Sequence, residues 1–180
     1  MKRIIIVFLL TSLYANCQES NQVKWILSSD ESYISYEGKH ILHQWSGTSK
    51  KVKGVMIMEN NQPLKTAIIS AVKDFDSGNS SRDSHAMEIL ETLLFPDVSF
   101  FGDSFIIKDE RFNLSGKMKF HSIEQNISVS GEWHKTDKNI ILKGRFKLKP
   151  SDFEIDLPDF MLVEMENNLN IEYELVFLKG

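Results

Sequence analysis

Alternating apolar and polar residues dominate the chain from Val23 onward. The clearest segment covers residues 112–120, where Phe, Leu, Gly, Met and Phe occupy every second position and Asn, Ser and Lys lie between them. A period of two is typical of a strand with one buried side and one side in water. The pattern therefore predicts a half-buried strand over these residues.

Two further segments repeat this alternation at once, over residues 126–134 and 140–148. The connection between them, Thr-Asp-Lys-Asn at 136–139, is short and polar, as in a turn between antiparallel neighbours. We therefore expect the three segments to form a meander of consecutive strands.

The remaining strand patterns predict a closed sheet. A long strand is expected over 169–177, after the turn-prone Asn167 and Asn168, and weaker patterns cover residues 23–27, 33–37, 51–58, 64–73 and 98–107. Glycines recur within these patterns at Gly54, Gly116, Gly131 and Gly144, where a strand tolerates them if it must bend sharply. About eight strands with such bends favour an all-β fold, an antiparallel eight-stranded barrel with room inside for one ligand.

One segment lacks the strand period. Asp83 or Ser84 is suited to capping a helix there, and Pro96 would stop it. The apolar side of this short helix, about three turns long, would consist of Met87, Leu90 and Leu94. A helix this short gains most of its stability from packing, so we expect it against the barrel, near its mouth.

The first residues have a composition of their own. Lys2 and Arg3 precede an apolar run over 4–10 and then small and polar residues, the order of a bacterial signal peptide. We assign residues 1–17 to that peptide and 18–180 to one domain; a buried first strand is the alternative. The apolar run is shorter than the roughly 20 residues of a membrane span.

Two cleavage sites would give two locations. A cut after Cys17 would release a soluble exported protein, periplasmic or secreted. A cut before Cys17 would leave an outer-membrane lipoprotein anchored through that thiol, but Asn16 is a poor match to the small residue expected at that position. The sequence therefore favours the soluble form.

Composition narrows the range of partners. The chain has 180 residues, enough for one domain, and a net charge of -4 with acidic and basic residues interspersed. We expect neither nucleic acid nor a polybasic membrane contact, and no transmembrane span in the mature chain. Cys17 is the only cysteine, so the domain has no internal disulfide and no thiolate metal cluster.

Catalytic motifs are missing from the sequence. There is no Gly-x-Ser-x-Gly elbow, His-Glu-x-x-His helix, Walker loop or dinucleotide glycine pattern, so we expect a protein that is not an enzyme and has no cofactor. A Ser/His/Asp set assembled in space stays open, because triads are recognised by geometry. His40 and His43 lack a nearby third donor for a metal, and packing against Trp45 is the simpler interpretation.

Several motifs occur together in one order. Residues 74–85 read Asp-Phe-Asp-Ser-Gly-Asn-Ser-Ser-Arg-Asp-Ser-His, and residues 95–100 read Phe-Pro-Asp-Val-Ser-Phe. This stretch closely resembles the central motif of the YceI-like family, and its Arg-Asp-x-His element is the most specific part. The other pieces that fall in the family's order are Gly-Thr-Ser after His43-Gln44-Trp45, Leu-Ser-Gly-Lys-Met at 114–118 and Pro-Ser-Asp-Phe at 150–153.

The resemblance covers nearly the whole mature chain and has two departures. Residues 88–92 read Glu-Ile-Leu-Glu-Thr where an aromatic pair is common, and the loop after Ile123 lacks the usual Gly-Val-Thr. The first departure leaves the ligand open. Members of the family are similar to lipocalins: extended antiparallel barrels, usually exported, with an apolar tunnel that holds a polyisoprenoid or another long-chain amphiphile.

The resemblance implies a lipid-binding barrel that carries, stores or sequesters a polyisoprenoid, a quinone or a similar lipid in the cell envelope. The expected lining of the tunnel is Met87, Leu90, Leu94, Met118, Phe120, Val129, Trp133, Phe146, Tyr173 and Leu175. Arg82, Asp83 and His85 form a charged cluster that would either bind a headgroup or hold the loop in place.

Two other barrels remain as alternatives. One is a solidly packed structural or interaction protein that acts through its surface loops. The other is an outer-membrane barrel, which needs apolar residues facing lipid. The outward set carries Lys117, Lys119, Lys143, Arg145 and Lys147, which suits an exterior in water. The oligomeric state stays open, with a homodimer among the options.

Overall fold

The computed structural model describes residues 21–41, 43–160 and 163–180, so the predicted signal peptide and Cys17 lie outside the described residues. The strands are β1 (Gln22–Leu27), β2 (Tyr33–His40), β3 (His43–Ser49), β4 (Lys53–Glu59), β5 (Gln62–Ala71), β6 (Asp97–Lys108), β7 (Arg111–Phe120), β8 (Ile123–Lys135), β9 (Asn139–Leu148), β10 (Asp159–Phe160), β11 (Val163–Glu164) and β12 (Leu169–Lys179). The helices are η1 (Ser29–Glu31), η2 (Val72–Asp74), α1 (Ser80–Ile89) and η3 (Pro150–Phe153).

The main sheet closes into a barrel. Its antiparallel order is β1-β4-β5-β6-β7-β8-β9-β12, and β12 also pairs with β1. β1 and β2 pair with successive parts of the same edge of β12. β4 pairs with β1, and β3 pairs with β2. β1 and β2 therefore act as one interrupted strand of the barrel, and β3 and β4 act as another. The prediction of an eight-stranded antiparallel barrel is confirmed, although β3 was not predicted as a strand.

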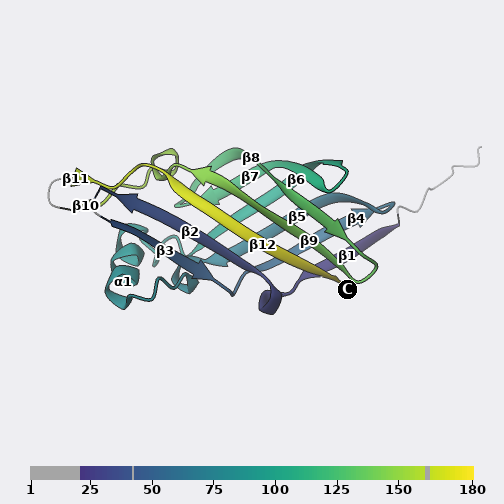
Figure 1. The fold of residues 1–180 in the computed structure, drawn as a ribbon, viewed down its shortest axis with the longest axis horizontal. Helices are drawn as coiled ribbons and strands as arrows, with labels where there is room; N and C mark the ends of the chain where they lie inside the picture. The colour runs from purple at the N-terminus through teal and green to yellow at the C-terminus, as the bar shows by residue number, and fades with distance from the viewer. Residues whose placement is uncertain (1–20, 42, 161–162) are drawn as a thin grey trace, which may run out of the picture.

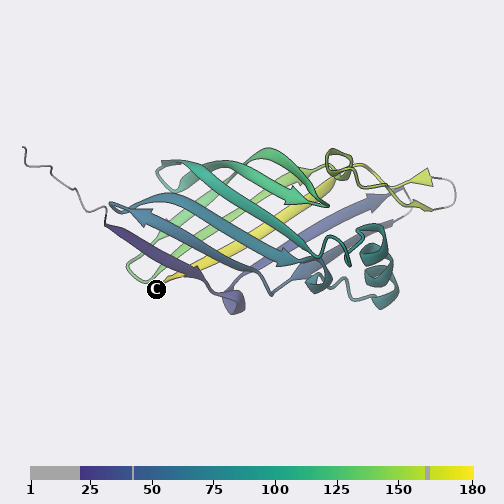
Figure 2. The ribbon, with the colours of Figure 1, turned by 180° about the vertical axis from the view of Figure 1, so that it is seen from behind.

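The barrel is elongated, and its two ends differ (Figures 1 and 2). α1 and the short β10-β11 hairpin lie at one end, and the turn between β8 and β9 lies at the other with the C-terminus. The segment between β5 and β6 returns along β3, since Thr48 and Asp76 exchange backbone hydrogen bonds of 2.9 and 3.1 Å. This pairing places α1 beside β3.

The helix begins earlier than the sequence predicts. Asn79 caps it, because its side-chain oxygen accepts the backbone N–H of Arg82 at 3.1 Å. Asn is among the strongest N-cap residues, and here the carboxylate of Asp83 is engaged by another backbone group. The helix ends at Ile89, and Glu91 has a left-handed backbone (φ 45). The prediction that Leu94 shares a helix face with Met87 is therefore wrong.

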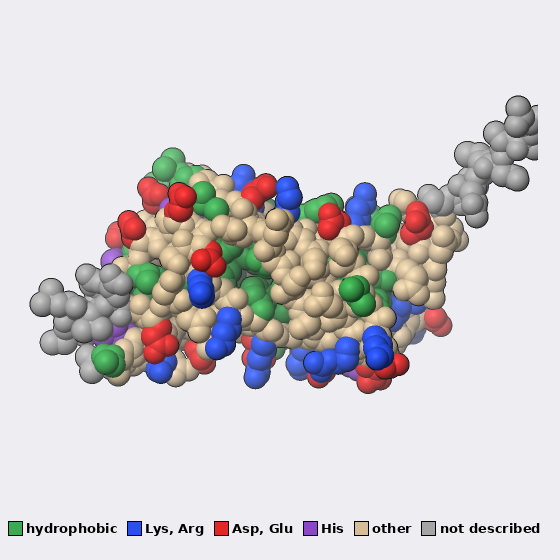
Figure 3. Space-filling view, turned by 90° about the horizontal axis from the view of Figure 1, so that it is seen from above, with side chains coloured by type: hydrophobic (Ala, Val, Ile, Leu, Met, Phe, Trp, Pro, Cys, Tyr) green, Lys and Arg blue, Asp and Glu red, His purple; other side chains and the backbone are tan. Residues whose placement is uncertain are grey.

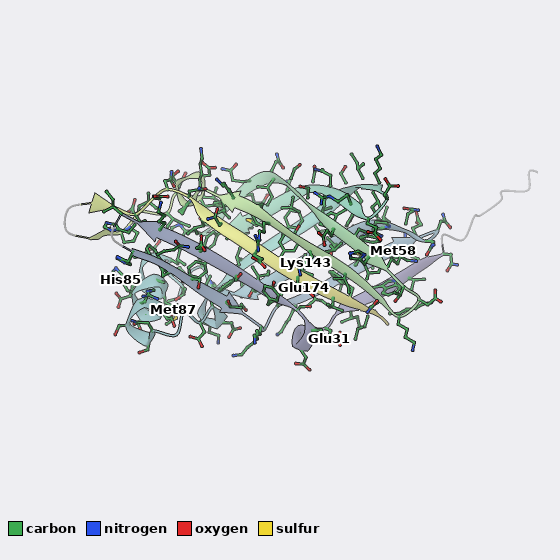
Figure 4. All side chains as sticks on the ribbon, in the orientation of Figure 1. Glu31, Met58, His85, Met87, Lys143 and Glu174 are labelled. Carbon is green, nitrogen blue, oxygen red and sulfur yellow. The ribbon has the colours of Figure 1, made fainter. Side chains whose placement is uncertain are left out.

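One half of the interior is solidly packed. The inward residues there are large and buried: Trp25, Met56, Trp133, Ile140 and Phe177 are all less than a tenth exposed. Met58, which is also buried, lies in this half, far from Met87 on α1 (Figure 4). The half that contains the C-terminus therefore has a filled core, and any ligand must occupy the other half.

Candidate functional site

The half of the barrel nearer α1 encloses a cavity of about 420 Å³ with a mainly apolar lining. The strands supply its walls through their inward positions, and α1 contributes Met87, Ile89 and Leu90. Along β12 the lining runs from Leu169 to Leu175, which are six residue steps, or roughly 20 Å, apart. The space is of the size and polarity of pockets that hold small apolar ligands.

Most of the predicted lining residues meet at this cavity. Those that line it are Met87, Leu90, Met118, Phe120, Val129, Phe146, Tyr173 and Leu175. Leu94 does not, because it lies beyond the end of α1 and is 69% exposed. Trp133 is 8% exposed but belongs to the packed half, opposite Leu142 on β9. An inward position alone could not distinguish the filled half from the hollow half.

Sequence reasoning missed further lining residues on strands that it had recognised. They include Ile34, Ile68, Phe112, Leu114, Ile127 and Ile171. The same alternation that selected Met118 and Val129 would have found most of them. Tyr36 and Phe75, whose rings lie 5.9 Å apart, belong to the lining as well, and only the pairing of β3 with Asp76 brings Phe75 there.

The predicted charged cluster lies at the end of the cavity beside α1, η2 and the β2-β3 hairpin, which we call the mouth. Arg82, Asp83 and His85 all line it, together with Lys73. The carboxylate of Asp83 accepts the backbone N–H of Ser77 at 3.2 and 3.3 Å, which holds the loop that enters α1. Asp83 therefore has a structural role in the loop.

Arg82 and His85 are held less firmly. The Arg82 guanidinium donates to the hydroxyl of Ser77 at 3.5 Å, at the limit of a hydrogen bond. The His85 ring lies 3.8 Å from the Glu88 carboxylate and is mostly exposed. His85 and Met87 are at the α1 end of the molecule in Figure 4. These contacts leave both side chains accessible to a ligand at the mouth.

The two other histidines of the mouth lie on neighbouring strands. His40 and His43 are cross-strand partners at the end of the β2-β3 hairpin, with ring centroids 5.4 Å apart, and the His43 ring is 5.5 Å from that of Trp45. The expected packing against Trp45 is thus observed for His43. Among the described residues, no group of three or more His, Cys, Asp or Glu side chains is arranged to hold a metal ion.

Two phenols, one buried and one partly buried, add polar atoms to the apolar lining. The Tyr173 hydroxyl donates to the backbone oxygen of Ser130 at 3.4 Å, and burial raises the pKa of Tyr173. Burial also raises the pKa of Tyr36, and the nearby carboxylate of Asp83 adds to that effect. Both phenols therefore stay neutral and remain available as hydrogen-bond partners for a polar group of a ligand.

Within the described part of the chain, no helix is long and apolar enough to cross a membrane. A search of curated proteins found no match to the chain.

Solved structures share the fold at low sequence identity. BcnA from Burkholderia cenocepacia superposes with a TM-score of 0.75 at 15% identity, covering 83% of this chain and 98% of that one. A polyisoprenoid-binding domain from Saccharophagus degradans, implicated in plant cell wall breakdown, gives 0.73 at 9% identity, covering 88% and 99%. The Campylobacter jejuni YceI protein gives 0.63 at 20% identity, covering 79% and 89%.

The comparison with protein families agrees with these structures and with the Arg-Asp-x-His motif at the mouth. The YceI-like domain matches residues 25–177, from the first strand of the barrel almost to the end of the last. The chain belongs to the YceI-like family.

Proposed function

We propose that this protein binds a long-chain apolar or amphiphilic lipid in the cavity and carries, stores or sequesters it in the cell envelope without changing it chemically. The observation that carries the proposal is the division of the barrel into a filled half and a hollow apolar half. A solidly packed barrel that acts only through its loops would have no need of the hollow half, so the cavity disfavours that alternative.

Burial of the tail would supply most of the affinity. Each methylene group that leaves water contributes about 0.8 kcal/mol, and the apolar lining extends over roughly 20 Å. A polyisoprenoid or the tail of a quinone would therefore bind tightly with few hydrogen bonds. The polyisoprenoid-binding domain of Saccharophagus degradans has the same fold, which supports a polyisoprenoid as the ligand class.

The charges at the mouth favour an anionic headgroup. Lys73 and Arg82 supply two cations there, against the one carboxylate of Asp83, which is already hydrogen-bonded to the loop. Arg82 is the better candidate because a guanidinium binds phosphate oxygens in a bidentate manner. A polyprenyl phosphate would place its phosphate at Arg82 and its tail between the strands.

Export would place the protein where such lipids occur. The signal-like composition of residues 1–17 supports a periplasmic or secreted location, with a lipoprotein anchored through Cys17 as the alternative. In this role the protein acts as a carrier, alone or as a homodimer, and not as an enzyme.

Native mass spectrometry tests the proposal directly. The protein, purified without denaturation from bacteria that export it, should carry a stoichiometric long-chain lipid that organic extraction releases and identifies. The variant Val129→Trp, which fills the cavity from β8, should lose that lipid. The control Asn126→Trp, at an exposed position on the same strand, should keep it. A lipid-free mass, unchanged after incubation with polyprenyl phosphates and quinones, would contradict the proposal.

A further inference from the structure

The wall of the barrel is open between two neighbouring strands, β8 and β9. β8 and β9 pair only from Lys135 and Ile140 to Gly131 and Gly144. Beyond these glycines β8 continues to pair with β7 as far as Ile123, and β9 with β12 as far as Leu148. Residues 123–130 of β8 and 145–148 of β9 therefore have no strand partner on their facing sides, and we call this gap the β8-β9 seam.

The narrow end of the seam is a formed structure. The Ser130 carbonyl, just beyond the last pair, accepts a hydrogen bond from the Tyr173 side chain instead of from β9. Tyr173 reaches it by passing beneath Gly144, where an added Cβ would lie 2.6 Å from the phenol oxygen. The glycine and the tyrosine together define where the two strands separate.

The wide end of the seam is closed by η3 through two polar contacts. The side-chain amide of Gln125 donates to the backbone oxygen of Asp152 at 2.7 Å. The ring of His121 lies 3.3 Å from the backbone oxygen of Phe153, a further hydrogen bond. The two hydrogen bonds connect residues of β8 and of the β7-β8 turn, on one side of the seam, to η3 on the other side. η3 follows directly after β9 in the chain. Opening η3 breaks these contacts and exposes the buried ring of Phe153, which packs on Phe120, but it breaks the pairing of no strand.

The edges of the seam are apolar and belong to the cavity. Ile127 and Val129 on β8 face Phe146 and Leu148 on β9, and all four line the cavity. Ile127 and Phe146 are only partly buried although they line the cavity. The space-filling view from above shows a hollow with apolar side chains inside it and charged side chains around it (Figure 3).

The mouth offers a less favourable path for an apolar tail. A tail that enters there must pass Lys73, Arg82 and Asp83 and displace water from these charged groups. This desolvation costs free energy, and an apolar tail forms no hydrogen bond or ion pair that would offset it. At the seam, the side chains that line the cavity on both strands are apolar. The two openings therefore suit the two parts of an amphiphile, a charged headgroup at the mouth and the tail at the seam.

We propose that the β8-β9 seam is a lateral entrance through which the lipid tail moves sideways into the barrel, and that η3 opens and closes it. The inference rests on the proposed function, because it concerns the route to the same cavity. It predicts that closing the seam slows the exchange of a ligand without changing its affinity.

Crosslinking across the seam tests this route. Asn126→Cys and Lys147→Cys, in a Cys17→Ser background, place two exposed thiols on opposite sides of the seam, to be joined by a flexible bis-maleimide. The matched control combines Asn126→Cys with Lys117→Cys, which are cross-strand partners over the closed β7-β8 seam. The probe is cis-parinaric acid, a fluorescent fatty acid, and stopped-flow fluorescence measures both of its rate constants.

The crosslinked seam should slow association and dissociation of the probe at least tenfold and leave Kd within twofold, whereas the crosslinked control should match the unmodified protein. Unchanged rates with normal affinity would overturn the seam as the entrance and leave the lipid-binding function standing. An equilibrium titration without any binding of the probe, in all variants and in the unmodified protein, would contradict both.

Weakening the contact between η3 and β8 provides a second test, because an entrance that opens more easily should exchange the probe faster. Gln125→Ala removes the contact to Asp152 and should speed release of the probe severalfold. Gln22→Ala is the control: it removes a comparable side-chain hydrogen bond, to Glu59 at 2.9 Å, in the packed half of the barrel. Equal release rates in the two variants would contradict a role for η3.

Discussion

The two halves of the barrel should respond differently to the same substitution. Phe177 lies in the packed half and is completely buried, whereas Phe146 borders the cavity and is only partly buried. Phe177→Ala leaves a new void in a filled core, which costs about 3–5 kcal/mol in unfolding free energy. Phe146→Ala only enlarges an existing space, because its ring already lacks contacts on the cavity side, and the expected loss is about 1–2 kcal/mol.

Urea denaturation followed by tryptophan fluorescence measures this difference. The proteins must be stripped of lipid first, because a ligand bound only to the folded state adds to the apparent stability. The midpoint should fall much further for Phe177→Ala than for Phe146→Ala, with the slope unchanged. Equal losses of stability would refute the division of the interior into a filled half and a hollow half.

Three further predictions follow from individual side chains. Gly144→Ala should destabilise the protein by about 1–3 kcal/mol in a thermal melt, because the new Cβ would lie 2.6 Å from both the Ser130 carbonyl and the Tyr173 hydroxyl; unchanged stability would contradict that crowding. Arg82→Ala should weaken binding of a polyprenyl phosphate about tenfold, and that of the uncharged polyprenol little, by fluorescence competition; an unchanged phosphate affinity would remove Arg82 from headgroup binding. Because burial raises the pKa of Tyr173 above its ordinary value of 10.0, the unfolded chain loses that proton first, so stability should fall as the pH rises above 10. Urea titrations should show a smaller fall in Tyr173→Phe, and an identical pH dependence would contradict the assignment.

Much of the barrel was predictable from residue periodicity. The alternation over 112–120, 126–134, 140–148 and 169–177 corresponds to β7, β8, β9 and β12, because inward and outward positions of a strand must differ in polarity when one side is buried. β3 escaped prediction, since its sequence His-Gln-Trp-Ser-Gly-Thr-Ser does not alternate. Its pairing with β2 and with Asp76 stabilises it as a strand.

The candidate site was predictable in type but not in extent. Alternation identified inward residues such as Val129 and Phe146, and the structure places them at the cavity. It also selected Trp133, which packs in the filled half, because inward residues look alike in sequence whether their neighbours touch them or leave a space. Leu94 falls outside the helix for a local reason: α1 ends at Ile89, and the left-handed backbone of Glu91 turns the chain before Leu94.

The sequence by itself determined the all-β class, the strands with regular alternation, the helix and the family motif at residues 82–85, because these depend on short-range periodicity and local chemistry. Only the tertiary structure decided where the barrel is hollow and where its wall is open. A cavity depends on how side chains from distant strands fill a shared volume, and the β8-β9 seam depends on where Gly131 and Gly144 end the pairing of two strands. Both properties arise between strands, so no single segment of the sequence contains them.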